Sequence, residues 1–562
     1  MKLSLENRQA QIIAFGSFLV TVIVITSTLI EPVNAPKMLI LSMTVFALIG
    51  LVDFRLPSTL QAKRNVPVIF LSGFFIWLWI STATSSQSFT HNFFGVYGRN
   101  SGTLTYSLLA VLFLISMKIV RSESQLKILN ALFYAGIFNL GYFLMTLFGF
   151  EIFNWNNPTN QVLGTFGNSN FAGAFMAFFS ILSLTRALDS RLSRPSRLFS
   201  GVVLFLGLFQ IDRSLAVQGY VIFLAGALLI CFFKVRESSK KSLKYSFVLA
   251  TQLVGIIGVF GLLNKGPLAW LIYKPSVTYR GFYWEAAWNT GLANPIFGVG
   301  PDSFGIYYRQ FRSSASVESV GLNTATDAAH NVFLDMFAYG GFPLFVMYLL
   351  LQFVVLVSIV RQVRHARKVD FQFQALVTIW LMYQIQSIVS INQIGLAIWG
   401  WVLGGLILAR GKNFSSGIDF GLSVKQNSKS KSSQKGAELL PASRVLKILV
   451  GALIGFAIAF PPVLADSRYF QAVKKGDALL VEKYALSWPT NPIRIGDASS
   501  IFLNNGYPDK ALQLAEIGIQ KFPQSFSAWK VLERIPGQSI IQENETKRTL
   551  AKLDPLDPEY RQ

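Results

Sequence analysis

The sequence predicts an all-α protein, a polytopic membrane helix bundle of about 12 to 13 spans followed by a helical domain outside the membrane. Its composition is the first reason, because 52% of the residues are hydrophobic, only 14% are charged, and the mean hydropathy is +0.45. Soluble domains carry about 25% charged residues. The other two reasons are the long apolar runs that recur from residue 10 to residue 464 and the alternation of basic residues between the connecting segments.

Thirteen apolar runs are candidates for membrane-spanning helices, because a hydrocarbon core of about 30 Å requires roughly 20 apolar residues per helix. Each backbone group in lipid needs a hydrogen-bond partner within the protein, and a helix supplies that partner within the same segment. The apolar runs are long enough for such helices, so helices are expected rather than barrel strands. The first run lacks a small-residue cleavage pattern and is interpreted as a retained span. The expected spans lie near residues 10–31, 37–52, 67–82, 102–118, 128–149, 170–186, 198–211, 215–233, 245–264, 343–360, 374–391, 394–409 and 445–464.

The distribution of lysine and arginine predicts the orientation. A cytoplasmic N-terminus places 29 of the 50 basic residues on the inner side and eight in the outer connections before residue 465. The positive-inside rule therefore predicts a multi-pass protein of the cell (inner or plasma) membrane with an extracytoplasmic C-terminal domain. Most of the net charge of +22 then reflects topology, which argues against a nucleic-acid partner. The single cysteine, Cys231, excludes a disulfide within the chain.

The chain divides into four expected parts. Residues 1–410 form the membrane domain, which includes a large outer loop at about 265–342. A Ser- and Lys-rich stretch at 411–443 is expected to be a disordered cytoplasmic linker. Residues 444–465 form the last transmembrane helix, and residues 466–562 form the extracytoplasmic domain.

The extracytoplasmic segment contains a repeat. Pro489 and Pro523 are 34 residues apart, and the intervening "GYPDKALQLAEIGIQKFP" spaces its small residues as a tetratricopeptide (TPR) helix pair does. "SAWKVL" then opens a further unit, so two to three TPR-like units are expected. Two interpretations remain open: a helical cap on the outer face, or a docking surface for a protein partner or an acceptor.

The loop at 265–342 is the main candidate for chemistry, because long connections without a span are usually functional. The apolar run that follows it, from Val332 to Val360, is longer than one span requires and is interrupted by Gly340, Gly341 and Pro343. We therefore expect a short interfacial helix at 331–339 and a span at 343–360. This division places His330 and Asn331 at a helix N-terminus, which favours nearby negative charge.

Polar residues in the outer connections are the other candidates. An arginine at the membrane edge is either functional or extends its charge to lipid headgroups. Arginine binds phosphate through paired hydrogen bonds, and a histidine can accept a proton near neutral pH. Asp302, after "GVGP", is expected to fix a turn. With no acidic pair in the outer connections, neither a metal nor another cofactor is expected. The substrate-binding candidates besides Asn331 are Arg99, Asn168, Asn170, Arg309 and Arg312, and the catalytic candidates are Arg213, Arg280 and His330.

These motifs resemble the O-antigen ligase/O-antigen polymerase superfamily of integral membrane glycosyltransferases, which includes protein O-oligosaccharyltransferases. The resemblance covers roughly residues 95–410, and its most specific part is "R…W…NPIFGVGPDSF…AHNVFLDMFAYGGFPLF". The segments "GTFGNSN" and "DRS…QG" follow the order of the family, and the TPR-like tail resembles a module appended to some members. The family often has Ser-Arg where this chain has Asp212-Arg213-Ser214.

The resemblance implies metal-independent, inverting transfer of a glycan from a polyprenyl-diphosphate carrier to an acceptor hydroxyl on the outer face. Arg213 and Arg280 would hold the diphosphate, and His330 would activate the hydroxyl. The implied partners are a lipid-linked oligosaccharide donor, membrane lipids, and a glycan, lipid or protein acceptor. Ligase, polymerase and protein-glycosylating activities all remain open.

Two other functions compete with glycan transfer. A transporter of bicarbonate or another small anion would suit the number of spans, but the two membrane halves show no internal repeat and the polar residues gather at one face. A scaffold that displays the tail would explain neither the long loop nor the arginines.

Overall fold

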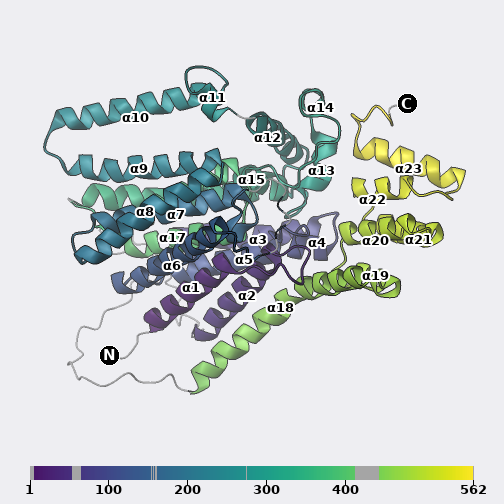
Figure 1. Ribbon diagram of the computed structural model, residues 1–562, viewed down its shortest axis with the longest axis horizontal. Helices are drawn as coiled ribbons and strands as arrows, with labels where there is room; N and C mark the ends of the chain where they lie inside the picture. The colour runs from purple at the N-terminus through teal and green to yellow at the C-terminus, as the bar shows by residue number, and fades with distance from the viewer. Residues whose placement is uncertain are drawn as a thin grey trace.

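The computed structural model describes residues 5–52, 65–153, 155, 157, 161–273, 275–366, 368–411 and 442–560. These residues are all-α and contain no sheet, as predicted (Figure 1). The expected linker at 411–443 lies almost wholly outside them.

Each of the thirteen expected spans coincides with a helix. Among the described residues, nine helices are long and apolar enough to cross a membrane, so the multi-pass architecture is confirmed with a smaller number of candidate spans. These nine are α2 (Asn34–Leu51), α3 (Val66–Thr84), α6 (Ser122–Leu147), α7 (Ser169–Leu188), α9 (Val217–Glu237), α10 (Lys241–Leu262), α15 (Val332–His365), α17 (Ile394–Gly411) and α18 (Ala442–Lys475). The remaining four expected spans coincide with α1 (Leu5–Val22), α5 (Thr103–Ser116), α8 (Arg194–Arg213) and α16 (Phe371–Val389).

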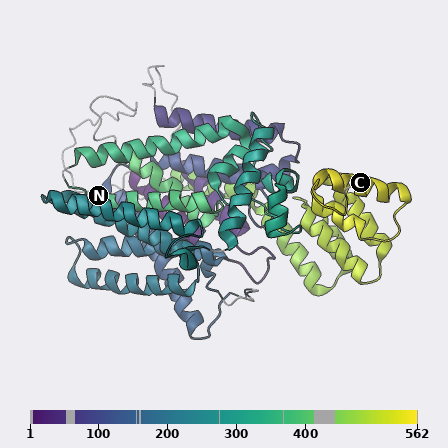
Figure 2. The same ribbon diagram turned by 90° about the horizontal axis from the view of Figure 1, so that it is seen from above.

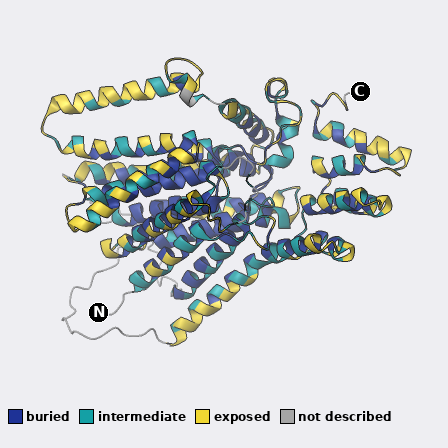
Figure 3. Ribbon diagram, viewed as in Figure 1, coloured by how far each residue is buried: buried dark blue, intermediate teal, exposed yellow. Residues whose placement is uncertain are grey.

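The interior of the bundle is built on α7 and α17, whose residues are almost all buried. In contrast, α10 buries only Gly261 and lies along one side of the bundle, exposed over its length (Figure 3). An apolar helix that makes so few protein contacts fits a position against lipid.

One end of the bundle carries the short elements, and the C-terminal helices project beyond that end (Figures 1 and 2). The short elements are α4 (Phe89–Phe94), η1 (Gly164–Phe166), α11 (Ala269–Ile272), α12 (Pro275–Ala293), α13 (Phe304–Phe311) and α14 (Ser314–Val320). The C-terminal helices are α19 (Ala478–Ala485), α20 (Pro492–Asn504), α21 (Pro508–Lys521), α22 (Phe526–Glu533) and α23 (Ile540–Leu553).

The first helix is shorter than the expected 10–31, because α1 ends at Val22. Its last carbonyl groups have partners from other helices: the Lys37 ammonium donates to the Val20 and Thr21 oxygens at 2.9 and 2.8 Å, and the Thr165 hydroxyl donates to Thr21 O at 2.8 Å. Carbonyls at a helix end must find partners when they are buried. Lys37 is therefore a structural residue of the bundle.

The predicted break in the long apolar run is confirmed. Helix α15 is non-helical at Gly340 and at Gly341, whose φ is +64°. The segment 295–300 docks into this break: the Val299 and Gly300 N–H groups donate to the Ala338 and Tyr339 oxygens at 2.9 and 3.0 Å. The "NPIFGVGP" and "YGGFP" motifs thus form one unit, which fixes the first half of α15 against the outer loop.

We expect Gly341→Ala to destabilise the protein by about 1–3 kcal/mol, because a non-glycine residue at positive φ is strained and the new Cβ would lie 2.3 Å from Pro295 O. Thermal unfolding in detergent measures the effect. Gly255→Ala in α10 is the control, because its Cβ would meet no atom within 4 Å. Equal unfolding temperatures for the two variants would contradict the assigned role of the break.

The C-terminal helices enclose a second apolar cluster that includes Tyr469, Trp529, Leu532 and Tyr560. Asn491 caps the start of α20 and Ser525 caps the start of α22, and these positions are 34 residues apart. A second core and a 34-residue spacing of helix starts are compatible with the expected repeat, and the TPR assignment stays a prediction.

Candidate functional site

The outer loop places His330 immediately before α15. Asn331 is the N-cap of this helix, and its side-chain oxygen accepts from the Phe333 and Leu334 N–H groups at 3.0 and 3.2 Å. The Ala329 N–H donates to Asp335 Oδ1 at 2.8 Å, which ties the residue before His330 to the first turn. His330 itself has a φ of +54°, so the chain reverses at the histidine. Asn331 therefore has a structural role in holding its neighbour.

Helix α12 forms the wall beside the histidine. The Trp284 indole N–H donates to His330 O at 3.4 Å, and the Tyr283 ring lies 5.6 Å from the imidazole at an interplanar angle of 31°. Trp288 packs on Phe337 of α15 at 4.9 Å, so the two helices are joined by aromatic contacts. No described side chain forms a hydrogen bond with the imidazole ring, which leaves its nitrogens available to a ligand.

Arg99 and Arg280 act electrostatically on His330. Burial first, and then the two guanidinium groups, lower the pKa of His330 to about 4, while Asp327 opposes this shift. Burial also lowers the pKa of Arg280, for which the described residues offer no ion-pair partner. A neutral imidazole beside two guanidinium groups can accept a proton while an anion occupies the site.

Arg99, in the loop after α4, is held by Asp327 of the outer loop. Its Nη2 forms an ion pair with Asp327 at 3.2 Å, and its side chain is 13% exposed. Its Nη1 is buried and has no hydrogen-bond partner among the described residues. Burial disfavours the charge, but Asp327 and Asp302 outweigh it and raise the pKa of Arg99. A buried guanidinium nitrogen without a partner is suited to bind an anion.

Asp302 positions the segment that carries Arg99. Its carboxylate accepts from the Val96 and Ser101 N–H groups at 2.8 and 3.3 Å and from the Tyr339 hydroxyl at 3.2 Å. Asp302 therefore has a structural role that differs from the expected one, because its carboxylate connects the loop after α4 with α15 and does not bond its own turn.

Three candidates lie apart from this cluster. Arg213 is exposed at the C-terminal end of α8, where the connection to α9 faces the end of the bundle that carries α11 to α14 (Figure 1). Asn168 caps α7 and accepts from the Asn170 N–H at 2.8 Å. Among the described residues, these three make no hydrogen bond or ion pair with His330, and their roles stay predictions.

Arg309 and Arg312 contact the C-terminal segment. Both form ion pairs with Asp554, at 2.8 and 2.7 Å, and Arg309 also stacks over Phe526 at 4.3 Å. Arg312 Nη1 donates in addition to Leu322 O at 2.8 Å. The two arginines share one carboxylate, and this shared ion pair fastens the tail to the outer loop.

Sequence reasoning placed Trp284 in the candidate loop without a role and did not select Tyr283 or Asp327. Tyr283 and Trp284 lie three and four positions after Arg280 on a helix, a spacing that turns side chains toward the same side. Asp327 lies three residues before His330. Helical spacing could have identified the aromatic pair, whereas the Arg99–Asp327 pair joins residues 228 apart and left no signal in the sequence.

The apolar bundle with a basic, histidine-containing site at one end is the architecture of a multi-pass membrane protein. Residues 199–349 match the O-antigen ligase family model, so this part of the chain is similar to glycosyltransferases of the glycan ligase or polymerase type. No curated protein matches the chain. The matched range runs from α8 into α15 and is narrower than the expected 95–410. It contains Arg213, Arg280 and His330, and Arg99 lies before it.

Proposed function

We propose that the protein transfers a glycan from a polyprenyl-diphosphate carrier to an acceptor hydroxyl at the extracytoplasmic face of the membrane, without a metal and with inversion. The observation that carries the proposal is the environment of His330 inside the ligase domain. Its imidazole is neutral, has no hydrogen-bond partner among the described side chains, and lies in the field of Arg99 and Arg280.

In this mechanism His330 accepts the proton of the acceptor hydroxyl. The hydroxyl oxygen forms a bond to the anomeric carbon while the bond from that carbon to the diphosphate oxygen breaks. The polyprenyl diphosphate leaves with the bonding electrons, and its developing charge is stabilised by Arg280 and by the free Nη1 of Arg99. Arg213, on the same end of the bundle, is proposed to contact the diphosphate as the carrier enters from the lipid.

The pKa of His330 gives a pH dependence with a definite sign. The base works only when neutral, so kcat/KM should be constant above about pH 5 and fall as the pH drops through about 4. A bound diphosphate offsets the positive charge of the two arginines and therefore raises the pKa of His330. Because kcat reports on the enzyme–substrate complex, kcat should fall at a higher pH than kcat/KM does. Rate profiles of the purified protein measure both limbs, and an acidic limb of kcat/KM near pH 7 would contradict the assignment.

Reconstitution tests the function itself. Full-length protein in nanodiscs is supplied with lipid-linked glycan extracted from host membranes and with oligosaccharide released from the host's surface polysaccharide. We expect a lengthened glycan product together with free polyprenyl diphosphate. Uptake of bicarbonate into proteoliposomes without any glycan product would favour the transporter instead.

A further inference from the structure

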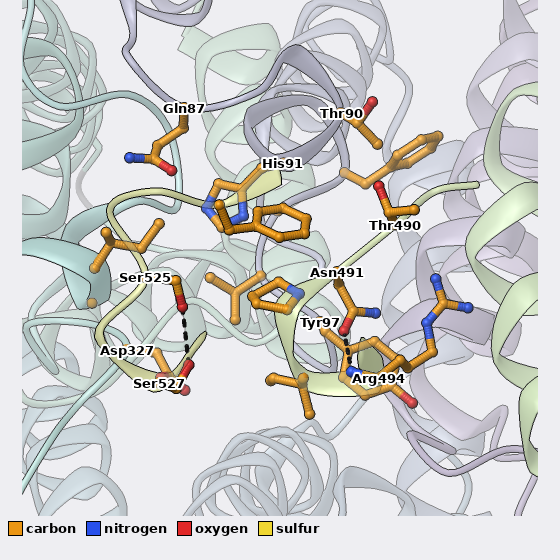
Figure 4. Close-up of a pocket in the computed structure, with 18 of the residues that line it drawn as sticks. Gln87, Thr90, His91, Tyr97, Asp327, Thr490, Asn491, Arg494, Ser525 and Ser527 are labelled. Atoms are coloured by element: carbon orange, nitrogen blue, oxygen red, sulfur yellow. Dashed lines mark hydrogen bonds between the residues drawn. The ribbon is translucent and has the colours of Figure 1, made fainter. Parts of the chain in front are cut away.

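A cavity of about 280 Å³ lies between the end of the bundle and the C-terminal helices. Its walls come from three parts of the chain: the segment 87–100 around α4, the outer-loop residues 305–309 and 325–327, and the C-terminal stretches 489–494 and 522–527. Figure 4 shows His91, Tyr97 and Arg494 around this cavity, together with Thr490 and Ser527. Pockets for drug-sized ligands measure about 300–1,000 Å³, so this cavity is near the lower end of that range and suits a small ligand or one unit of a larger ligand.

Three side chains that line the cavity have buried polar atoms without partners among the described residues. They are His91 Nε2, Asn100 Oδ1, and Nε and Nη1 of Arg494. Asn100 and Arg494 are buried, and His91 is half-buried. Buried polar atoms are nearly always hydrogen-bonded, so these three side chains have unused hydrogen-bonding capacity beside the cavity.

The unpaired atoms indicate which ligand chemistry fits. Arg494 supplies donors and Asn100 Oδ1 is an acceptor. The His91 ring already bonds the Asp302 backbone and burial lowers its pKa to about 4, so the ring is neutral and Nε2 is also an acceptor. A phosphate only accepts hydrogen bonds and would leave Asn100 unpaired beside the Asp327 carboxylate. A hydroxyl group both donates and accepts, so a ligand with several hydroxyl groups satisfies all three side chains.

The charges and rings of the wall agree with a neutral sugar. Each charged side chain of the wall has an opposite charge near it: Asp327 is paired with Arg99, Arg309 shares the Asp554 carboxylate with Arg312, and Asp466 acts on Arg494. Phe94, Phe522 and Phe526 contribute apolar faces. Apolar walls with a few directed polar groups are usual for small-ligand sites.

Asp327 connects this cavity with the site around His330. It lines the cavity, forms the ion pair with Arg99, and acts on the pKa of His330. We propose that the cavity between the bundle and the C-terminal helices binds a neutral sugar unit of a glycan substrate near the reacting groups. This inference rests on the proposed glycan transfer and deepens it, because it assigns a substrate-binding role to the tail.

Cavity-filling variants test the proposal. Thr490 is half-buried and its hydroxyl makes no hydrogen bond to a described residue, and Ser527 lines the cavity from another stretch of the tail. We expect Thr490→Trp and Ser527→Trp each to weaken binding by about tenfold or more, because the indole displaces the sugar from its hydrogen bonds. The probe is oligosaccharide released by mild acid from the host's surface polysaccharide, titrated against full-length protein in nanodiscs. Asn544→Trp, exposed on α23 and outside the cavity, is the matched control and should bind as the parent does.

The transfer assay shows whether the bound sugar belongs to the acceptor or to the lipid-linked donor. A raised KM for the free oligosaccharide in both cavity variants assigns the cavity to the acceptor, and a raised KM for the lipid-linked glycan assigns it to the donor. Unchanged binding and unchanged KM values in both variants, with unfolding temperatures equal to that of the parent, would overturn the proposal. A parent protein that transfers no glycan contradicts the proposed function instead, and the binding titration still reports on the cavity.

Discussion

Replacing His330 with alanine is expected to reduce glycan transfer by about 10²- to 10⁴-fold, the usual contribution of a positioned general base. The acceptor hydroxyl would lose the only described imidazole beside Arg99 and Arg280. The measurement is kcat for transfer from lipid-linked glycan by the purified variant. The bound donor should be retained, because the two arginines remain.

The backbone at this position requires a second variant. His330 has a φ of +54°, a conformation that costs energy for alanine and less for asparagine. His330→Asn therefore keeps the chain reversal and removes the base, and we expect it to lose transfer to the same extent. His365→Ala, exposed at the far end of α15, is the matched control with full activity expected. Full transfer by a folded His330→Asn protein would rule out the base.

The second large effect is expected for Arg280. Arg280→Ala should lower kcat by about 10²- to 10³-fold, as loss of one preorganised group at a developing charge does. Arg280→Lys should recover part of this loss, because lysine keeps the charge without the paired hydrogen bonds. Arg361→Ala, on an exposed position of α15, serves as the control for removal of a positive charge.

Arg280→Ala also gives an independent measurement at His330. Arg280 lowers the pKa of His330, so its removal should move the acidic limb of kcat/KM to higher pH. A lower kcat with an unchanged acidic limb of kcat/KM would show that Arg280 does not act on the pKa of His330, and would contradict the proposed arrangement. A change confined to the KM of the donor would assign Arg280 to binding alone.

Local patterns were sufficient to predict most of the helices and the division of α15. The run from Val332 to Val360 is too long for one span, and Gly340, Gly341 and Pro343 are poor residues for a helix interior, so the break could be inferred from neighbours in sequence. His330 followed from the same reasoning, because the break determines where the short helix begins.

Contacts between distant segments were not predictable in this way. Arg309 and Arg312 resemble the other outer arginines in sequence, and only the folded chain places Asp554 against them. Lys37 is likewise one of the eight basic residues assigned to the outer connections by sequence, although its ammonium group bonds the carbonyls at the end of α1. The sequence states which residues are charged, whereas tertiary contacts decide which charges remain free for a substrate.

The ion pairs of Asp554 have a consequence for how the protein is made. Arg312 is buried, and a buried charge without its partner is strongly unfavourable. Asp554 is synthesised 242 residues after Arg312, and chains fold from the N-terminus as they emerge. The outer loop therefore reaches its final packing only after the tail has been translated and has folded back. We therefore expect a chain that ends before Asp554 to insert into the membrane without its outer loop reaching the final packing.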